Sequence, residues 1–203
     1  MVRIRLYVEG GGESKALRAE CRRGFSEFLK KAGATGRTLK IIACGGRANA
    51  YDSFRIALSQ SSSGTDSPML LVDAEGTVIA AGPWEHLHDR EGWTRPEGAG
   101  DGQCQLMVQC MEAWFLADRD SLATYFGRGF REAALPGGQH VESIAKADVL
   151  DGLVHASRDT SKGRYRKGEH SFRILALIDP TRVKSKAPHA ARFLAAICDG
   201  RGP

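Results

Sequence analysis

The sequence predicts an α/β protein with a mostly parallel four-stranded sheet, flanking helices and a helical C-terminal portion. Two observations predict this class. Short apolar runs typical of strands alternate with longer amphipathic segments, and glycine-rich turns join the two kinds of segment. Strands that alternate with helices pair in parallel through right-handed crossovers. The turns that follow the strands are therefore expected at one edge of the sheet.

The first two strand-turn-helix units follow one another directly. A strand at Ile4–Val8 leads into three glycines at 10–12, and a second strand at Leu39–Cys44 leads into Gly45-Gly46. The first predicted helix, closed by Gly33 and Gly36, has an apolar face of Leu17, Cys21, Phe25, Phe28 and Leu29, and the second has Ala50, Tyr51, Phe54, Ala57 and Leu58. A polar, serine-rich connection at 60–67 then leads to the third strand.

The third strand, Met69–Val72, ends in two carboxylates, Asp73 and Glu75. Residues 75–103 show neither a strand nor a helix period. They contain glycine, proline and charges of both signs around two tryptophans, and no element is predicted there. A fourth strand is expected at Gln105–Cys110, followed by helical spacing over 111–118. The rest of the chain is expected to be helical, with apolar faces at 144–154, 172–178 and 193–197.

The length of 203 residues fits a single domain at 1–203, with a sheet core at 1–118 and a helical extension at 119–203. No apolar run is long enough to cross a membrane, and the apolar run near the N-terminus is too short and too charged for a signal peptide. We therefore expect a cytoplasmic protein without membrane contact. The five cysteines have no CxxC spacing, which favours buried thiols. The oligomeric state is left open.

Acidic side chains follow three of the predicted strands. Glu9 follows the first strand, Asp73 and Glu75 the third, and Glu112 the fourth. Glu13 is better explained as part of a helix start, although it could join these acids as a metal ligand. Mg²⁺ and Mn²⁺ prefer oxygen ligands, and clustered carboxylates repel one another without a cation. We therefore predict a magnesium or manganese site. A lysine or arginine that already neutralised these oxygens would remove the enzymatic hypothesis and leave only the predicted fold.

A basic segment at 161–170 precedes one of the C-terminal helices. Its candidates for binding phosphate or nucleic acid are Lys162, Arg164, Arg166, Lys167 and His170, with Arg47 at another helix start as a further candidate. Tyr165 in the same segment is a candidate for stacking on a base. A solvated basic loop explains the segment equally well. A net charge of +5 is compatible with a polyanionic partner, although charge alone is weak evidence.

The segments Val8-Glu-Gly-Gly-Gly-Glu and Leu71-Val-Asp-Ala-Glu-Gly resemble the Toprim arrangement, in which a glutamate follows the first strand and paired acids follow a later one. The chain is also similar to a bacterial family of uncharacterised function with a Toprim-like core. The shared motifs are Cys44-Gly-Gly-Arg, Met111-Glu-Ala-Trp-Phe-Leu-Ala-Asp and the segment 170–180. The resemblance implies that Glu9 is a general acid/base and that Asp73 and Glu75 are metal ligands. At the place of Glu75, Toprim proteins usually have aspartate.

Toprim domains occur in topoisomerases, primases, recombination proteins and nucleases of the OLD type, several of which act with ATPases in defence against phage. The resemblance therefore implies a Mg²⁺- or Mn²⁺-dependent nuclease acting on DNA or RNA, with an ATPase as a possible protein partner. Two alternatives remain open. One is a subunit that binds a partner or nucleic acid without cleavage, and the other is a metal-dependent phosphotransferase acting on a small molecule. The phosphate-binding motif GxxxxGK[ST] is absent from the sequence.

Overall fold

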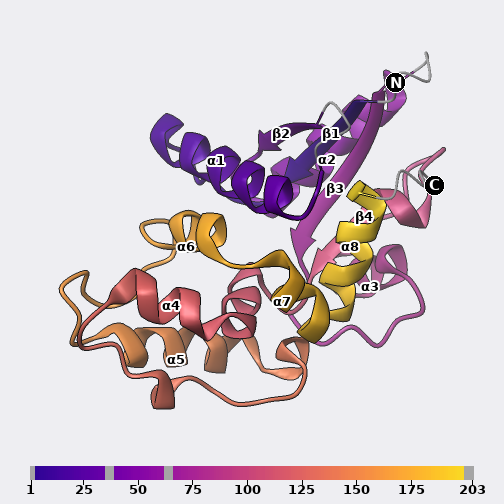
Figure 1. Ribbon diagram of the computed structural model, residues 1–203. Coiled ribbons are helices and arrows are strands. Elements are labelled where there is room, and N and C mark those ends of the chain that lie inside the picture. The colour runs from indigo at the N-terminus through magenta and orange to yellow at the C-terminus, as the bar shows by residue number, and fades with distance from the viewer. Residues whose placement is uncertain (1–2, 35–38, 62–65, 199–203) are drawn as a thin grey trace.

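The computed structural model describes residues 3–34, 39–61 and 66–198. Its centre is a four-stranded sheet in the order β2-β1-β3-β4 (Figure 1). The strands are β1 (Arg3–Val8), β2 (Leu39–Ala43), β3 (Asp66–Asp73) and β4 (Cys104–Met107). All three pairings between these strands are parallel. The predicted α/β class with a four-stranded parallel sheet is therefore confirmed, and the arrangement is consistent with a Toprim-like fold.

Two long helices connect the first three strands, as the sequence predicts. Helix α1 (Lys15–Lys31) begins after Ser14, whose Oγ accepts a hydrogen bond from the backbone N–H of Leu17 at 3.0 Å. Helix α2 (Arg47–Ser59) begins after Gly46. Gly36 and residues 62–65 of the serine-rich connection lie outside the described residues.

Alternating side chains of the strands pack into two different hydrophobic clusters. In β1, Leu6 and Val8 join the cluster that contains α1 and the C-terminal helices, whereas Tyr7 joins the cluster that contains α2 and α3 (Pro83–Glu91). This alternation follows from the two-residue period of a strand. The sheet is thus covered on both faces, which leaves the carboxyl ends of its strands as the place where polar side chains can meet.

Most of the C-terminal helices lie beyond the ends toward which β1 and β3 run, whereas the last helix, α8 (Pro188–Cys198), lies beside β4 (Figure 1). Trp114 is fully buried and stacks with Phe28 of α1 and with Phe193 of α8, at ring-centroid distances of 5.4 and 6.1 Å. The α-helices of the C-terminal half are α4 (Arg119–Phe126), α5 (Lys146–Ser157), α6 (Ser171–Leu177), α7 (Pro180–Lys186) and α8 (Pro188–Cys198). The shorter 3₁₀ helices are η1 (Asp101–Gln103), η2 (Met111–Ala117), η3 (Glu132–Ala134) and η4 (Val141–Ser143). The expectation of a helical C-terminal portion is confirmed.

Two local expectations need correction. The stretch after Glu75 contains helix α3, a helix of nine residues that is too short to show a clear helical period. The fourth strand ends at Met107 instead of Cys110, and the helical spacing after it forms the 3₁₀ helix η2. Among the described residues, we find no helix that is both long and apolar enough to cross a membrane.

Candidate active site

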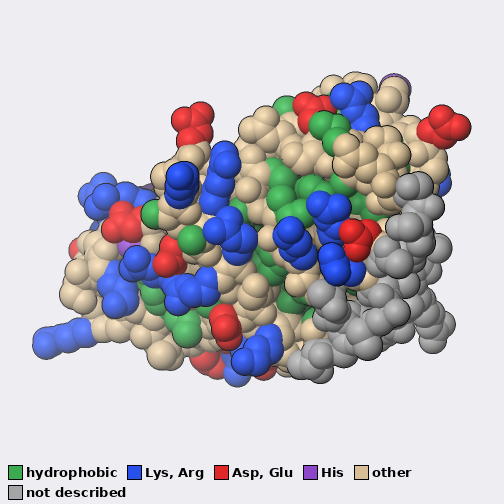
Figure 2. Space-filling model, turned by 90° about the horizontal axis from the view of Figure 1, so that it is seen from above, with side chains coloured by type: hydrophobic (Ala, Val, Ile, Leu, Met, Phe, Trp, Pro, Cys, Tyr) green, Lys and Arg blue, Asp and Glu red, His purple; other side chains and the backbone are tan. Residues whose placement is uncertain are grey.

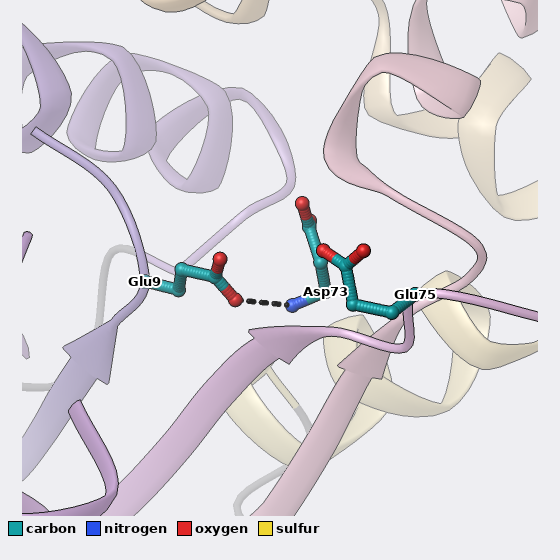
Figure 3. A group of neighbouring side chains, drawn as sticks. All are labelled: Glu9, Asp73 and Glu75. Carbon is teal, nitrogen blue, oxygen red and sulfur yellow. Dashed lines mark hydrogen bonds between the residues drawn. The ribbon is translucent and has the colours of Figure 1, made fainter. Parts of the chain in front are cut away.

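Three of the predicted acids meet where neighbouring strands end. Glu9 directly follows β1, Asp73 is the last residue of β3, and Glu75 lies two residues further on (Figure 3). One carboxylate oxygen from each lies within 4.8 Å of the others. Glu9 Oε2 also accepts a hydrogen bond from the backbone N–H of Asp73 at 3.1 Å. The cluster follows directly from the parallel pairing of β1 with β3.

Asp73 is the most deeply buried member of the cluster, with 2% of its surface exposed. Its Oδ1 accepts a hydrogen bond from the backbone N–H of Met111 at 2.8 Å, in the turn after β4. Burial raises the pKa of Asp73 despite this bond and two nearby lysines. Burial, and next to it the charge of Asp73, also raises the pKa of Glu9, to about 7. Both carboxylates therefore hold a proton more readily than a carboxylate in water does.

Glu75 is held in a different way. Its φ of 63° lies in the left-handed region, which is unusual for a residue other than glycine. The backbone N–H of Glu75 donates to Gln109 O at 2.8 Å, and the Gln109 side chain accepts a bond from the N–H of Lys146 at the start of α5. Burial alone would raise the pKa of Glu75, but the hydrogen bond and charge of Lys146 outweigh it and lower the pKa.

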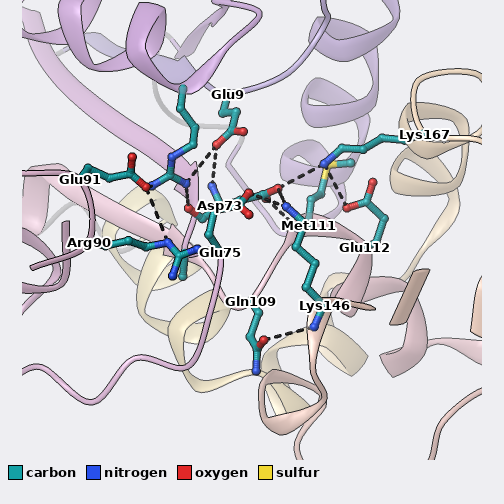
Figure 4. A network of polar contacts seen from close by, with 12 residues as sticks. Glu9, Asp73, Glu75, Arg90, Glu91, Gln109, Met111, Glu112, Lys146 and Lys167 are labelled. Atoms are coloured by element: carbon teal, nitrogen blue, oxygen red, sulfur yellow. Dashed lines mark hydrogen bonds and ion pairs between the residues drawn. The ribbon is translucent and has the colours of Figure 1, made fainter. Parts of the chain in front are cut away.

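Two lysines and an arginine of the protein already neutralise part of this charge (Figure 4). Lys146 Nζ lies 2.5 Å from Glu75 Oε1 and 3.8 Å from Asp73 Oδ2. Lys167 Nζ lies 3.3 Å from Asp73 Oδ2 and 3.7 Å from a Glu112 oxygen. The condition that no lysine or arginine neutralises these acids is thus not met. Because these cations neutralise only part of the charge, the finding weakens the enzymatic hypothesis without removing it.

Arg47 is the third cation, and its place differs from the exposed phosphate ligand expected from the sequence. Its guanidinium donates to the backbone oxygen of Asp73 and lies 3.5 Å from Glu9 Oε2 and 3.2 Å from Glu91 Oε1. It also packs 5.3 Å from the centre of the Trp93 ring. Arg47 therefore ties α2 and the segment after α3 to the ends of β1 and β3.

Glu112 lies in the interior beside the cluster, with no surface exposed. Its Oε1 accepts a hydrogen bond from Tyr165 Oη at 2.9 Å. Within the described part of the chain, no hydrogen-bond donor reaches its Oε2, whose nearest cationic partner is Lys167. Asp73 and Glu112 raise the pKa of Lys167 even though burial lowers it. Glu13, in contrast, is exposed at the turn before α1.

The basic segment at 161–170 divides into side chains with different surroundings. Lys167 turns inward to the acids, as described above. Lys162 and Arg166 stay at the surface, where Lys162 Nζ lies 5.4 Å from the centre of the Tyr125 ring and Arg166 pairs with Glu169 at 3.2 Å. Arg164 is also exposed. Lys and Arg side chains are also scattered over the face seen in Figure 2.

His170 and Tyr165 are found in the interior and not at a binding surface. His170 is 3% exposed, its Nδ1 accepts a bond from the N–H of Arg166 at 3.1 Å, and burial lowers its pKa. Tyr165 is 4% exposed, and its hydroxyl is bound to Glu112, so its ring cannot stack on a base without a rearrangement. The basic and aromatic composition of the segment 161–170 therefore did not reveal which of its side chains are buried.

The donor set fits a hard divalent cation. Three carboxylates supply oxygen ligands within a few ångströms, and Asp73 and Glu9 keep raised pKa values although three cationic side chains lie beside them. Glu112 Oε2, which no hydrogen-bond donor among the described residues reaches, is a further oxygen that shares Lys167 with Asp73. Glu9, Asp73 and Glu75 are therefore the residues that would hold Mg²⁺ or Mn²⁺.

Sequence reasoning missed Lys146 and Gln109. Both approach Glu75 from parts of the chain without any motif, since Lys146 lies 71 residues further along. The sequence around a lysine at the start of a helix does not indicate which distant carboxylate the lysine will contact. Only the packing of α5 against η2, the 3₁₀ helix that follows β4, brings it there.

Comparisons with known proteins add a family but no activity. The searches of curated proteins and of solved structures returned no match. A family described as "Domain of unknown function (DUF4276)" matches residues 8–197, which is nearly the whole chain and includes all four acids of the site. The chain therefore belongs to the DUF4276 family.

Proposed function

We propose that this protein is a metal-dependent nuclease that hydrolyses phosphodiester bonds of DNA or RNA with Mg²⁺ or Mn²⁺ at Glu9, Asp73 and Glu75. The observation that carries the proposal is the meeting of these three carboxylates at the ends of adjacent parallel strands, within 4.8 Å of one another. Such a rim is where open α/β sheets bind their ligands. The resemblance to Toprim proteins supports the same assignment.

The lysines beside the acids are compatible with this proposal for two reasons. First, the pKa values of Glu9 and Asp73 remain raised in their presence, so these cations only partly offset the cost of burying the two carboxylates. Second, the side chains of Lys146 and Lys167 are 24% and 52% exposed, and a flexible four-carbon stem carries each ammonium group. Both ammonium groups can therefore turn toward solvent or a substrate. A divalent cation would take the place of Lys146 between Glu75 and Asp73.

Each residue then has a role that follows from its surroundings. Glu9 would hold the cation with one carboxylate oxygen and accept a proton from water with the other, and the Asp73 N–H fixes the direction of this carboxylate. Lys167 supplies positive charge for a phosphate oxygen. A bound Mg²⁺ or Mn²⁺ supplies the remaining charge that offsets the negative charge of the phosphate and activates water.

The proposal is tested by measuring metal binding and cleavage on the same proteins. We expect Mn²⁺ binding, followed by calorimetry, and Mn²⁺-dependent cleavage of labelled DNA or RNA. Asp73→Asn should weaken Mn²⁺ binding by at least roughly 10- to 100-fold, a loss typical even of residues one step removed from a metal. Asp52→Asn is the matched control, because Asp52 is exposed on α2 and pairs only with its neighbour Arg55. Full activity of Asp73→Asn would refute the assignment.

A second candidate function is favoured by one specific observation, the three cations that already accompany the acids. In this case the polar network stabilises the fold, and the protein binds nucleic acid or a protein partner without cleaving anything. Calorimetry separates the two candidates. Absence of Mn²⁺ binding by the wild type, together with retained binding of an oligonucleotide, would favour the binding module.

A further inference from the structure

A cavity of about 230 Å³ opens directly beside the acids. One end is polar and is formed by Glu9, Asp73 and Lys167. The lining also has an apolar part, to which Leu17 and Phe172 contribute. A ligand that fills this cavity must therefore combine an apolar group with a group that tolerates both carboxylates and an ammonium ion.

The turn after β1 forms a further part of the lining, without side chains. It consists of three glycines at 10–12, with φ values of 139°, 88° and 48°, that bring the backbone up to the cavity. Residues other than glycine rarely adopt such angles, and glycine is common where the backbone approaches a ligand closely. The cavity is thus a narrow space between the turn, the basic segment and Met111 after β4.

Its volume limits the occupant. About 230 Å³ is the space of about eight water molecules at about 30 Å³ each. It is smaller than the roughly 300–1,000 Å³ typical of sites for drug-sized ligands. A volume of this size admits a group about as large as one base, and it does not admit a base that stays paired and stacked in a duplex.

A groove continues from the cavity over the surface. It shares Leu17, Lys167 and Gly168 with the cavity and extends to Arg173 and Ser14. The groove is also lined by Glu20, which lies 3.8 Å from Arg173, and by Glu169, so its charge is mixed. Within it, the exposed guanidinium of Arg173 and the ammonium of Lys167 are the groups that can contact the phosphates of a chain that leaves the cavity. A single nucleotide alone would not need this continuation.

We infer that the substrate is a single-stranded or unpaired segment of nucleic acid, with one base in the cavity and the adjoining phosphodiester at the acids. This inference rests on the proposed function and adds the substrate class to it. The apolar part of the lining would bury the base, and Lys167 lies where the cavity meets the groove. A base in a duplex would have to leave its stack to enter, so paired strands should bind more weakly.

Binding is measured by fluorescence anisotropy with a fluorescein-labelled ten-nucleotide single strand and with the same sequence in a blunt duplex, in Ca²⁺ to avoid cleavage. We expect the wild type to bind the single strand at least roughly tenfold more tightly than the duplex. Leu17→Trp, which fills the cavity from α1, should remove most of this preference. Ala19→Trp is the matched control, because it adds the same side chain at an exposed position of the same helix outside the cavity.

The outcomes distinguish this inference from the proposed function. Equal affinity for single strand and duplex, or an unchanged preference in Leu17→Trp, overturns the inference even if the protein cleaves nucleic acid. A clear preference that Leu17→Trp removes supports the inference even if no cleavage is found. Circular dichroism checks the fold of the variant, and if Leu17→Trp does not fold, the smaller Leu17→Phe takes its place with the same expected direction.

Discussion

The raised pKa of Glu9 predicts a specific dependence of stability on pH. The carboxyl has a pKa of about 7 in the folded protein, against an ordinary value of 4.5, mainly because it is buried. Between these two values the folded state holds a proton that the unfolded state releases, so stability falls as pH rises from about 4.5 to about 7. The difference of about 2.5 pKa units corresponds to about 3 kcal/mol. Only 18% of the Glu9 side chain is exposed, so solvent screening reduces this figure little.

Glu9→Gln isolates this contribution. Glutamine resembles the protonated carboxyl and can still accept the hydrogen bond from the Asp73 N–H. We expect the variant to match the wild type near pH 4.5 and to exceed its free energy of unfolding by up to about 3 kcal/mol at pH 8. Urea denaturation in EDTA at a series of pH values measures the difference. Glu132→Gln, at a surface position with 53% of the side chain exposed, is the control and should follow the wild type.

The same variant tests the link to metal binding. Because a metal binds the ionised carboxylate, the affinity of the wild type for Mn²⁺ should rise with pH until about 7 and then level off. In Glu9→Gln this part of the rise should disappear. Parallel stability curves for wild type and Glu9→Gln between pH 4.5 and 8 would refute the reasoning about burial, whatever the metal does.

Two further predictions concern the partners of the acids. Lys146→Met should lower stability in EDTA by about 2 kcal/mol, because Glu75 loses a hydrogen bond to a charged group, and added Mn²⁺ should raise the melting temperature more than in the wild type. An Mn²⁺ response equal to that of the wild type would contradict metal binding at the place of Lys146. Tyr165→Phe should cost about 1–3 kcal/mol in urea denaturation, because buried Glu112 loses the donor to its Oε1. An unchanged urea midpoint would show that another donor replaces the hydroxyl.

Much of the fold could be predicted because its signals are local. The amphipathic period of α1 and α2 and the short apolar strands are readable within windows of ten to twenty residues. Helix α3 was not predicted, because its nine residues have a mixed charge pattern without a clear helical period. The end of β4 was misplaced because apolar residues continue past Met107 into the 3₁₀ helix, and composition does not mark where pairing stops.

The candidate site could be predicted in part. Glu9, Asp73 and Glu75 could be placed together because the carboxyl ends of parallel strands share one edge. The direction of the side chains in the basic segment could not be predicted. The Lys167 ammonium contacts Asp73, whereas Arg166 beside it pairs with Glu169 at the surface. Neighbours in a loop are oriented by whatever packs against them, and that information is not local.

By itself, the sequence determined that this chain forms a parallel α/β sheet and that acids follow its strands, because strand and helix periods and strand-end residues are encoded in short windows. Only the tertiary structure decided which charges accompany those acids. Lys146, Lys167 and Arg47 come from α5, the segment before α6 and the start of α2, and they reach the acids across separations of 26 to 94 residues. Electrostatic energy depends on distance in space, so the protonation of Glu9 and Asp73, and with it any affinity for a metal, is a property of the packed molecule.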